Sequence, residues 1–294
     1  MTVADRIALA VVVVIWGLHY VVAKTALDQF PPLFMIVLRL AIVAILLSPF
    51  LFRRRPPLKA LAGLALSLGV FNYGLLYGGL AGIDAGPAAI AGQLSVPFSV
   101  LLAGVIFHER LSAFQGIGMA AAFAGVWLIA GEPRTAPSLG SLVAVIGSSV
   151  AWAITSVQIR RLGPINGFVF NAWVALIALP FILAASLLME SGQIEAVRAA
   201  DWRGWTAVLY SSIAVSVFSW TLWYRLLSKY GVGRVVPMNL LCPVLAVGFA
   251  ILLRGEPLTW EIAAGSLITV AGVALIHFAT QKLRAVGRTG ELRG

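Results

Sequence analysis

Runs of apolar residues long enough to cross a lipid bilayer follow one another through almost the whole chain. A transmembrane helix needs about 20 mainly apolar residues. Only 11% of the 294 residues are charged, against about 25% in an average soluble domain. A soluble fold could not bury so much apolar surface, so we predict an all-α polytopic membrane protein. Its ten predicted transmembrane helices cover residues 6–25, 32–52, 59–80, 86–107, 112–130, 139–159, 166–188, 203–225, 233–253 and 260–280.

Lys and Arg residues are concentrated in alternate loops, which predicts how the chain is oriented in the membrane. Cytoplasmic loops carry an excess of these residues. With the N-terminus inside, the predicted outer loops hold only Lys24, Arg134, Arg198, Arg203 and Arg254. We therefore predict a multi-pass protein of the cell inner membrane with both termini in the cytoplasm. The net charge of +10 follows from this loop pattern, so we expect the lipid bilayer and no nucleic acid as its partner.

The second half of the sequence repeats features of the first half at an offset of 147 residues. Glu109 matches Glu256, Gly118 matches Gly265, and Ala124-Gly125-Val126 matches Ala271-Gly272-Val273. These matches predict two repeats of five transmembrane helices, residues 1–134 and residues 135–294 with a short basic tail. Because five is odd, the second repeat must be inverted, as in many secondary transporters with a site near the midplane. Such a chain already contains both orientations, so we expect a monomer.

Each repeat places a proline four residues after an amide side chain inside a predicted helix. The pairs are Gln93 with Pro97 and Asn239 with Pro243. Proline has no N–H, so we expect the carbonyl groups of Gln93 and Asn239 to lack their helical partners. Polar groups left free in a membrane should face another helix or a wet cavity. One interpretation is a substrate contact with hinges at both prolines, and the other is a plain kink.

Aromatic side chains inside the predicted helices are candidate walls of a substrate cavity. Tyr73 and Tyr77 lie on one face of a helix, and Tyr224 matches Tyr77 in the second repeat. Such side chains offer a large apolar surface with one polar group, but they also anchor helices at the membrane interface. His19 lies one turn after Trp16 and is either a hydrogen-bonded packing residue or a cavity donor and proton carrier.

Arg39 is the permanent charge that the sequence places deepest in a predicted helix. It needs a partner, which is either a structural cluster of carbonyl groups or a substrate carboxylate. We expect a structural charge at this position. The candidate substrate-binding residues are Trp16, His19, Tyr73, Tyr77, Gln93, Ser95, Trp152, Ser156, Asn171, Ser216, Tyr224 and Asn239.

The sequence lacks the patterns typical of an enzyme, a metal site or a bound cofactor. It has no nucleophile–base spacing and no glycine loop that would cradle phosphate, and Cys242 is its one cysteine. All 11 acidic residues lie in loops or at helix ends, where we expect Glu109 and Glu256 to act as loop or cap elements. Proton-driven transporters commonly hold an acid within the membrane. We therefore predict uncoupled transport unless His19 carries the proton.

Several motifs resemble the EamA family of the drug/metabolite transporter superfamily. They are Trp16-Gly17, Arg39-Leu40-Ala41, the Pro97 helix, Glu109-Arg110-Leu111 with its twin Glu256-Pro257-Leu258, and the Ala-Gly-Val pairs. The resemblance implies ten helices in two inverted repeats around a central cavity, usually for metabolite export. His19, the paired tyrosines and the tryptophan-rich helices resemble the YddG-type aromatic amino acid exporters. The second repeat departs from the pattern, since it lacks the arginine motif.

These observations together predict the kind of transport. We expect an exporter of small amphipathic metabolites, amino acids including aromatic ones, that works by alternating access without proton coupling. One alternative is a proton-coupled multidrug or nucleotide-sugar carrier of the same superfamily. A more distant alternative is a membrane scaffold that transports nothing.

Overall fold

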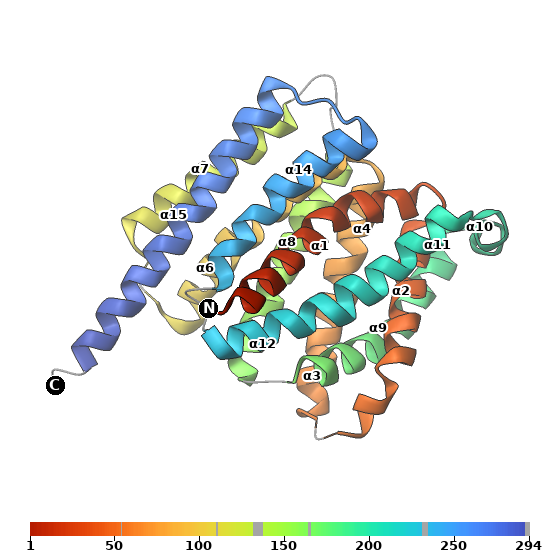
Figure 1. The fold of residues 1–294 in the computed structure, drawn as a ribbon, viewed down its shortest axis with the longest axis horizontal. Coiled ribbons are helices and arrows are strands. Elements are labelled where there is room, and N and C mark those ends of the chain that lie inside the picture. The colour runs from red at the N-terminus through yellow and green to blue at the C-terminus, as the bar shows by residue number, and fades with distance from the viewer. Residues whose placement is uncertain (54, 110, 132–137, 164–165, 231–234, 292–294) are drawn as a thin grey trace.

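The computed structural model describes residues 1–53, 55–109, 111–131, 138–163, 166–230 and 235–291, and these segments form helices joined by short loops (Figure 1). The described residues contain no strand. In chain order, the elements are α1 (Val3–Leu27), α2 (Pro32–Leu46), η1 (Ser48–Phe52), α3 (Leu58–Leu64), η2 (Ala65–Asn72), α4 (Tyr73–Ala81), α5 (Ala85–Gly92), α6 (Ser95–Phe107), α7 (Ala113–Ala130), α8 (Leu139–Leu162), α9 (Gly167–Met189), α10 (Gln193–Ala199), α11 (Trp202–Leu209), η3 (Tyr210–Ser219), α12 (Trp220–Tyr230), η4 (Val236–Leu240), α14 (Leu241–Arg254) and α15 (Trp260–Glu291).

Among the residues that the structure describes, eight helical segments are long and apolar enough to cross a membrane, which confirms the prediction of an all-helical polytopic protein. The second and ninth predicted helices are shorter in the structure, at Pro32–Leu46 and Met238–Arg254. α2 ends just before Ser48-Pro49, because a proline disfavours helical backbone in the residue that precedes it. Ten membrane spans therefore stay a prediction.

Short polar residues fix where several of the helices begin. Ser112 Oγ accepts a hydrogen bond from Gln115 N, and Gln115 Oε1 accepts one from Ser112 N, which forms a capping box at the start of α7. Asp201 begins α11 in the same way, by accepting bonds from the N–H groups of Arg203 and Gly204. A further hydrogen bond from Gln29 is the main cause that lowers the pKa of Asp201.

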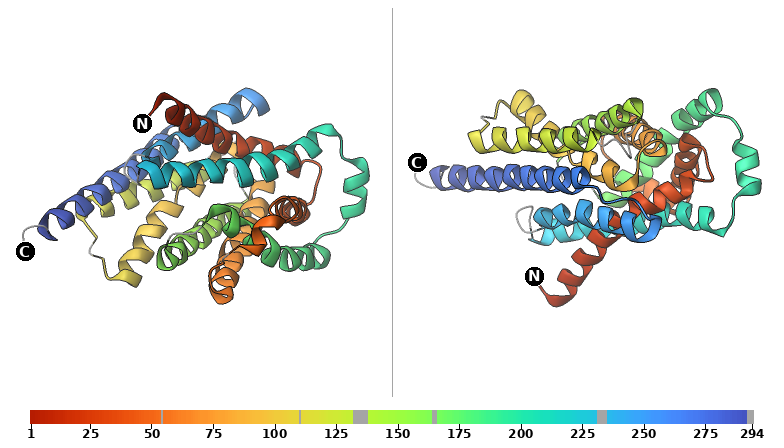
Figure 2. Two further views of the ribbon diagram at one scale, coloured as in Figure 1. Left: turned by 60° about the horizontal axis from the view of Figure 1, so that its bottom comes forward. Right: turned by 90° about the horizontal axis from the view of Figure 1, so that it is seen from above.

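α7 and α15 lie side by side, and α15 projects beyond the rest of the bundle at its C-terminal end (Figures 1 and 2). A Cβ atom at Gly118 would lie 2.6 Å from the carbonyl oxygen of Gly272, and one at Gly125 would lie 2.5 Å from that of Gly265. The contacts pair the earlier glycine of one helix with the later glycine of the other, so the two helices are antiparallel. Their backbones touch because none of these four residues has a side chain.

The third and eighth predicted helices each contain a π-helical segment, η2 and η3 respectively. At the offset of 147 residues, η2 falls within η3 and the two segments end at the same position, directly before an aromatic residue, Tyr73 or Trp220. π-Helical turns are uncommon and are frequently found at functional sites. The two π-helical segments therefore occupy matching positions in the two halves of the chain.

The fourth and ninth predicted helices are interrupted near their amide–proline pairs. α5 stops at Gly92 and α6 starts at Ser95, whereas η4 passes into α14 at Leu241. The expectation of a free carbonyl at Gln93 is wrong, because that oxygen accepts a hydrogen bond of 3.0 Å from Val96 N. The chain forms a 3₁₀ turn there, with a hydrogen bond between residues three apart. The Gln93 carbonyl is therefore satisfied although Pro97 has no N–H. Hinge motion at Pro97 and Pro243 stays a prediction.

Candidate functional site

Arg39 of α2 is the centre of a buried polar network. It is 2% exposed, and its Nη1 atom donates to Tyr77 Oη at 2.8 Å. The Nε and Nη2 atoms donate to Ser216 Oγ at 3.1 and 2.9 Å. The guanidinium also lies over the ring of Tyr73, 4.6 Å from its centroid. Among the described residues, no carboxylate is within ion-pair distance of Arg39, so oxygen atoms of hydroxyl groups and aromatic faces surround this charge.

Two further predicted residues extend this network. His19 Nε2 lies 3.0 Å from Tyr77 Oη, and Asn171 Nδ2 donates to the carbonyl oxygen of Ser216 at 3.2 Å. The members come from α1, α2, α4, α9 and η3, so both halves of the chain contribute. The structure thus brings together six of the residues that the sequence singled out: His19, Arg39, Tyr73, Tyr77, Asn171 and Ser216.

Four tryptophans from both halves form an aromatic cluster beside the network. The Trp16 ring centroid lies 5.0 Å from that of Trp220 and 4.9 Å from that of Trp223. Trp152 joins through Trp220, at 5.7 Å. Trp16 precedes His19 by about one helical turn on α1, so the cluster and the polar network adjoin each other. The rings are tilted against one another and together offer a large apolar surface.

Four polar side chains in or near this region have atoms without a hydrogen-bond partner. Within the described chain, His19 Nδ1, Tyr20 Oη, Tyr73 Oη and the side-chain amide of Gln93 make no hydrogen bond. All four side chains are only half-buried, and these atoms are not among the occluded ones. An unpaired polar group in hydrocarbon costs several kcal/mol, roughly. These four groups are therefore available to a polar ligand or to water.

The remaining predicted site residues lie elsewhere or make local bonds. Ser156 Oγ donates to the carbonyl oxygen of Trp152, one turn earlier in α8. Asn239 Oδ1 accepts from Cys242 Sγ at 3.0 Å, and the carbonyl oxygen of Ser95 accepts from Ser99 Oγ at 2.6 Å. The side chain of Tyr224 is outside the part of the chain that the structure describes.

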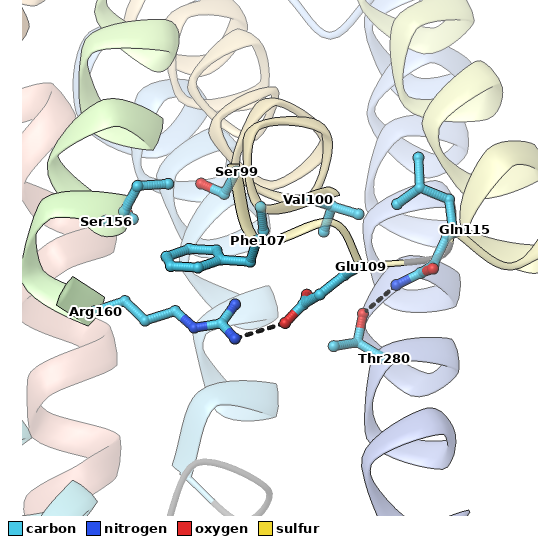
Figure 3. Close-up of a pocket in the computed structure, with 11 residues that line it drawn as sticks. Ser99, Val100, Phe107, Glu109, Gln115, Ser156, Arg160 and Thr280 are labelled. Carbon is cyan, nitrogen blue, oxygen red and sulfur yellow. Dashed lines mark hydrogen bonds and ion pairs between the residues drawn. The ribbon is translucent and has the colours of Figure 1, made fainter. Parts of the chain in front are cut away.

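A pocket of about 460 Å³ opens at one end of the bundle, between α6, α7, α8 and α15 (Figure 3). Arg160 and Glu109 form an ion pair of 2.5 Å across it, and the Arg160 guanidinium lies 4.1 Å from the ring centroid of Phe107. Gln115 and Thr280 close its other side with a hydrogen bond of 2.9 Å. Ser156 lines this pocket and not the central network. We refer to this end of the bundle as the Glu109 end.

The opposite end, which we refer to as the Glu256 end, is held together by two charged side chains. Glu256 accepts hydrogen bonds from Ala85 N at 2.8 Å and Gly86 N at 3.0 Å, so it caps α5 from the other half of the chain. Lys24 Nζ donates to the carbonyl oxygens of Leu80 and Ile83 at 2.9 and 2.6 Å. The expectation that Glu256 caps a helix is confirmed. Burial raises its pKa, against the opposite effect of the two N–H groups.

Sequence reasoning left two residues of the central region out of its site. Trp220 connects Trp16 with Trp152, and it occupies the position of Tyr73 at the offset of 147 residues. Applying the repeat to Tyr73 would have found it. Tyr20 has no such signal, because it looks like one more aromatic residue in α1. Only the packing of α1 against α5, where its hydroxyl approaches Gly92, places it beside the Gln93 segment.

Two curated relatives and a solved structure are similar to this chain over nearly its whole length. The chain is 29% identical to a "Probable amino-acid metabolite efflux pump" of Salmonella typhimurium, over 99% of both chains. It is 28% identical to a protein of the same description from Escherichia coli, over 96% of this chain and 97% of the relative. A solved crystal structure superposes with a TM-score of 0.66 at 17% identity, covering 96% of this chain and 99% of the other, which shows the shared fold.

A family-wide sequence comparison matches the chain twice. The EamA-like transporter family covers residues 6–131 and again residues 139–278, which together make up most of the chain. The matches fall on either side of the loop between α7 and α8. The motifs that resembled this family thus have the expected context in the structure, and the chain belongs to the EamA-like transporter family.

Proposed function

We propose that this transporter exports small amphipathic metabolites, with amino acids and among them aromatic ones as substrates. The observation that carries the proposal is that the buried Arg39 network, with the unpaired polar atoms of His19 and Tyr73, adjoins the cluster of four tryptophans. A ligand with one charged or polar end and one apolar end matches both surfaces. The relatives described as amino-acid metabolite efflux pumps support the same class of substrate.

We also propose that the two halves are inverted repeats that alternate around this region. Gly118 contacts Gly272, and Gly125 contacts Gly265. The offset of 147 residues relates Gly118 to Gly265 and Gly125 to Gly272, so it converts one contact into the other. A two-fold axis between antiparallel helices produces this pattern, and an axis in the membrane plane inverts one half. With both termini in the cytoplasm, the Glu256 end faces outward and is closed by its caps. The pocket at the Glu109 end then faces the cytoplasm.

The proposed function is tested by transport of labelled phenylalanine into proteoliposomes that contain the purified protein, with and without a pH gradient. We expect saturable transport that competing tryptophan and methionine reduce and that does not require the gradient. Transport that occurs only with the gradient would contradict the uncoupled mechanism. If none of these amino acids is transported or competes, aromatic amino acids are not the substrates.

Trp220→Ala is expected to raise the KM for phenylalanine by about tenfold, because it removes the ring that joins Trp16 to Trp152. Loss of one well-placed aromatic contact costs on the order of 1 kcal/mol, and 1.4 kcal/mol corresponds to tenfold. Trp127→Ala is the matched control, since this tryptophan is 82% exposed on α7. An equal effect of both substitutions would place the substrate away from the tryptophan cluster.

Glu256→Ala is expected to open the Glu256 end. It removes two charge-assisted hydrogen bonds to the start of α5, each contributing roughly 1.5–3 kcal/mol. The measurement is labelling of a Val21→Cys, Cys242→Ala variant with an impermeant maleimide, because Val21 is buried beneath this cap beside Ala85. We expect labelling at least about tenfold faster than with Glu256 present. The exposed Glu195→Ala should leave the rate unchanged.

A further inference from the structure

A chain of hydrogen bonds leads from Arg39 through Tyr77 to His19 and determines where each proton lies. The Arg39 guanidinium can only donate, so Tyr77 Oη accepts at the 2.8 Å contact. Tyr77 is fully buried, and the other partner of its hydroxyl is His19 Nε2 at 3.0 Å. A buried O–H group without an acceptor costs about 1–3 kcal/mol. The Tyr77 proton therefore points at His19, and His19 Nε2 is the acceptor.

This direction fixes the state of the His19 ring. With Nε2 accepting, the imidazole is neutral and its one proton is on Nδ1. A second proton would place another cation beside the buried Arg39 guanidinium. The titratable groups that face this part of α1 in the described residues are Tyr20, Arg39, Tyr73, Tyr77, Tyr210 and Cys242. None is a carboxylate, so nothing among them would stabilise an imidazolium.

The Nδ1–H group is left free for a ligand. It has no partner in the described chain, and His19 is only half-buried. We propose that His19 Nδ1–H donates to a carboxylate oxygen of the substrate, and that Tyr77 and Arg39 are the positioning residues that hold it in this state. The assignment rests on the proposed function. The charge of Arg39 has no carboxylate partner among the described residues, so it favours an anionic group near the free Nδ1–H of His19. His19 is then a specificity-determining donor and not a proton carrier.

The protonation state is tested directly, without any transport. The full chain is prepared with ¹⁵N-labelled histidine in nanodiscs, and the His19 signals are assigned by their loss in His19→Gln. We expect a protonated Nδ1 and an unprotonated Nε2 at every pH from about 5 to about 8, which spans the ordinary imidazole pKa. In Tyr77→Phe we expect both tautomers and a titrating ring. A wild-type ring that is protonated on Nε2, or that titrates in this range, would falsify the assignment.

The role toward substrate is tested by two substitutions with different geometry. Asparagine can place an N–H group near the position of Nδ1, whereas glutamine reaches toward Tyr77 and lacks that donor. Competition by phenylalanine and by phenylalaninamide, which has no carboxylate, is measured against labelled phenylalanine. We expect His19→Gln to weaken competition by phenylalanine about tenfold and to leave competition by phenylalaninamide unchanged. Competition by phenylalanine in His19→Asn should be closer to that in wild type. Equal losses for both competitors would overturn the carboxylate contact.

The two experiments separate this inference from the proposed function. If wild-type protein does not transport phenylalanine but shows a fixed Nδ1–H tautomer, the substrate class is wrong and the hydrogen-bond direction stands. If wild-type protein transports phenylalanine and His19→Gln binds it equally well, transport stands and the His19 contact is wrong. A correctly folded His19→Gln variant is recognised by an unchanged melting temperature.

Discussion

Arg39→Met is expected to reduce transport by roughly 100-fold while the melting temperature of the purified protein stays the same or rises. The substitution removes a buried positive charge that no described carboxylate neutralises. Burying such a charge costs several kcal/mol, roughly, so folding alone gives no reason to keep it. In contrast, removing a charge that holds His19 in place and favours an anionic ligand beside it should cost about 2–5 kcal/mol of binding.

The neighbours of Arg39 explain why stability should survive the substitution. Ser216 Oγ retains its bond of 3.0 Å to the carbonyl oxygen of Ser211, and Tyr77 Oη retains its contact with His19. Neither hydroxyl is therefore left unsatisfied when the guanidinium is removed. Methionine fills a similar volume with an apolar chain, which a buried position tolerates. Two quantities are compared: the initial rate of transport in proteoliposomes and the thermal unfolding of the detergent-purified protein.

Arg198→Met provides the control, because Arg198 is an exposed arginine of α10 outside the long apolar helices. It should change neither quantity. Arg39→Lys keeps the charge but not the planar fork that reaches both Tyr77 and Ser216, and we expect an intermediate rate. A large loss of stability in Arg39→Met together with unchanged transport per folded molecule would make Arg39 a purely structural residue.

The membrane class and the helix positions were predictable because they depend on local composition. A run of about 20 apolar residues has few alternatives to a membrane-spanning helix. The spacing of Tyr73 and Tyr77 likewise places them on one helical face, and both approach Arg39. Such spacing involves only residues close together in the chain, so it can be read directly from the sequence.

The partners of Arg39 were not predictable from local patterns. Ser216 lies 177 residues further along the chain, and only the packing of α2 against η3 brings the two together. Gln93 shows a similar limit. The missing N–H of Pro97 predicts the loss of one helical hydrogen bond, but not that Val96 N donates to the Gln93 carbonyl oxygen instead. The internal repeat is the exception, because it relates distant positions directly. Glu256 and Trp220 both have a matching residue in the first half.

Gly125→Ala is expected to destabilise the protein strongly, because the added Cβ would lie 2.5 Å from the Gly265 carbonyl oxygen and 2.7 Å from Thr269 N. These atoms belong to the backbone of α15, so the helices must separate to admit one methyl group. Overpacking of this kind costs about 1–3 kcal/mol. With roughly 2–4 °C per kcal/mol for a chain of this order of size, the melting temperature should fall by about 3–10 °C.

Gly116→Ala is the matched control in the same helix. A Cβ at Gly116 has no atom within 4 Å, and alanine favours helix, so this variant should be as stable as wild type or slightly more so. If Gly116→Ala lowers the melting temperature as much as Gly125→Ala does, the destabilisation does not come from the contact between α7 and α15.

The proposed two-fold symmetry makes a sharper prediction for the other glycines. Gly272 occupies the position of Gly125 in the second half, and its Cβ would lie 2.5 Å from the Gly118 carbonyl oxygen. Gly272→Ala should therefore lower the melting temperature by nearly the same amount as Gly125→Ala. The double variant should lose less than the sum, because the first substitution already separates the helices at the shared interface. Clearly unequal single effects, or full additivity, would contradict a symmetric contact between α7 and α15.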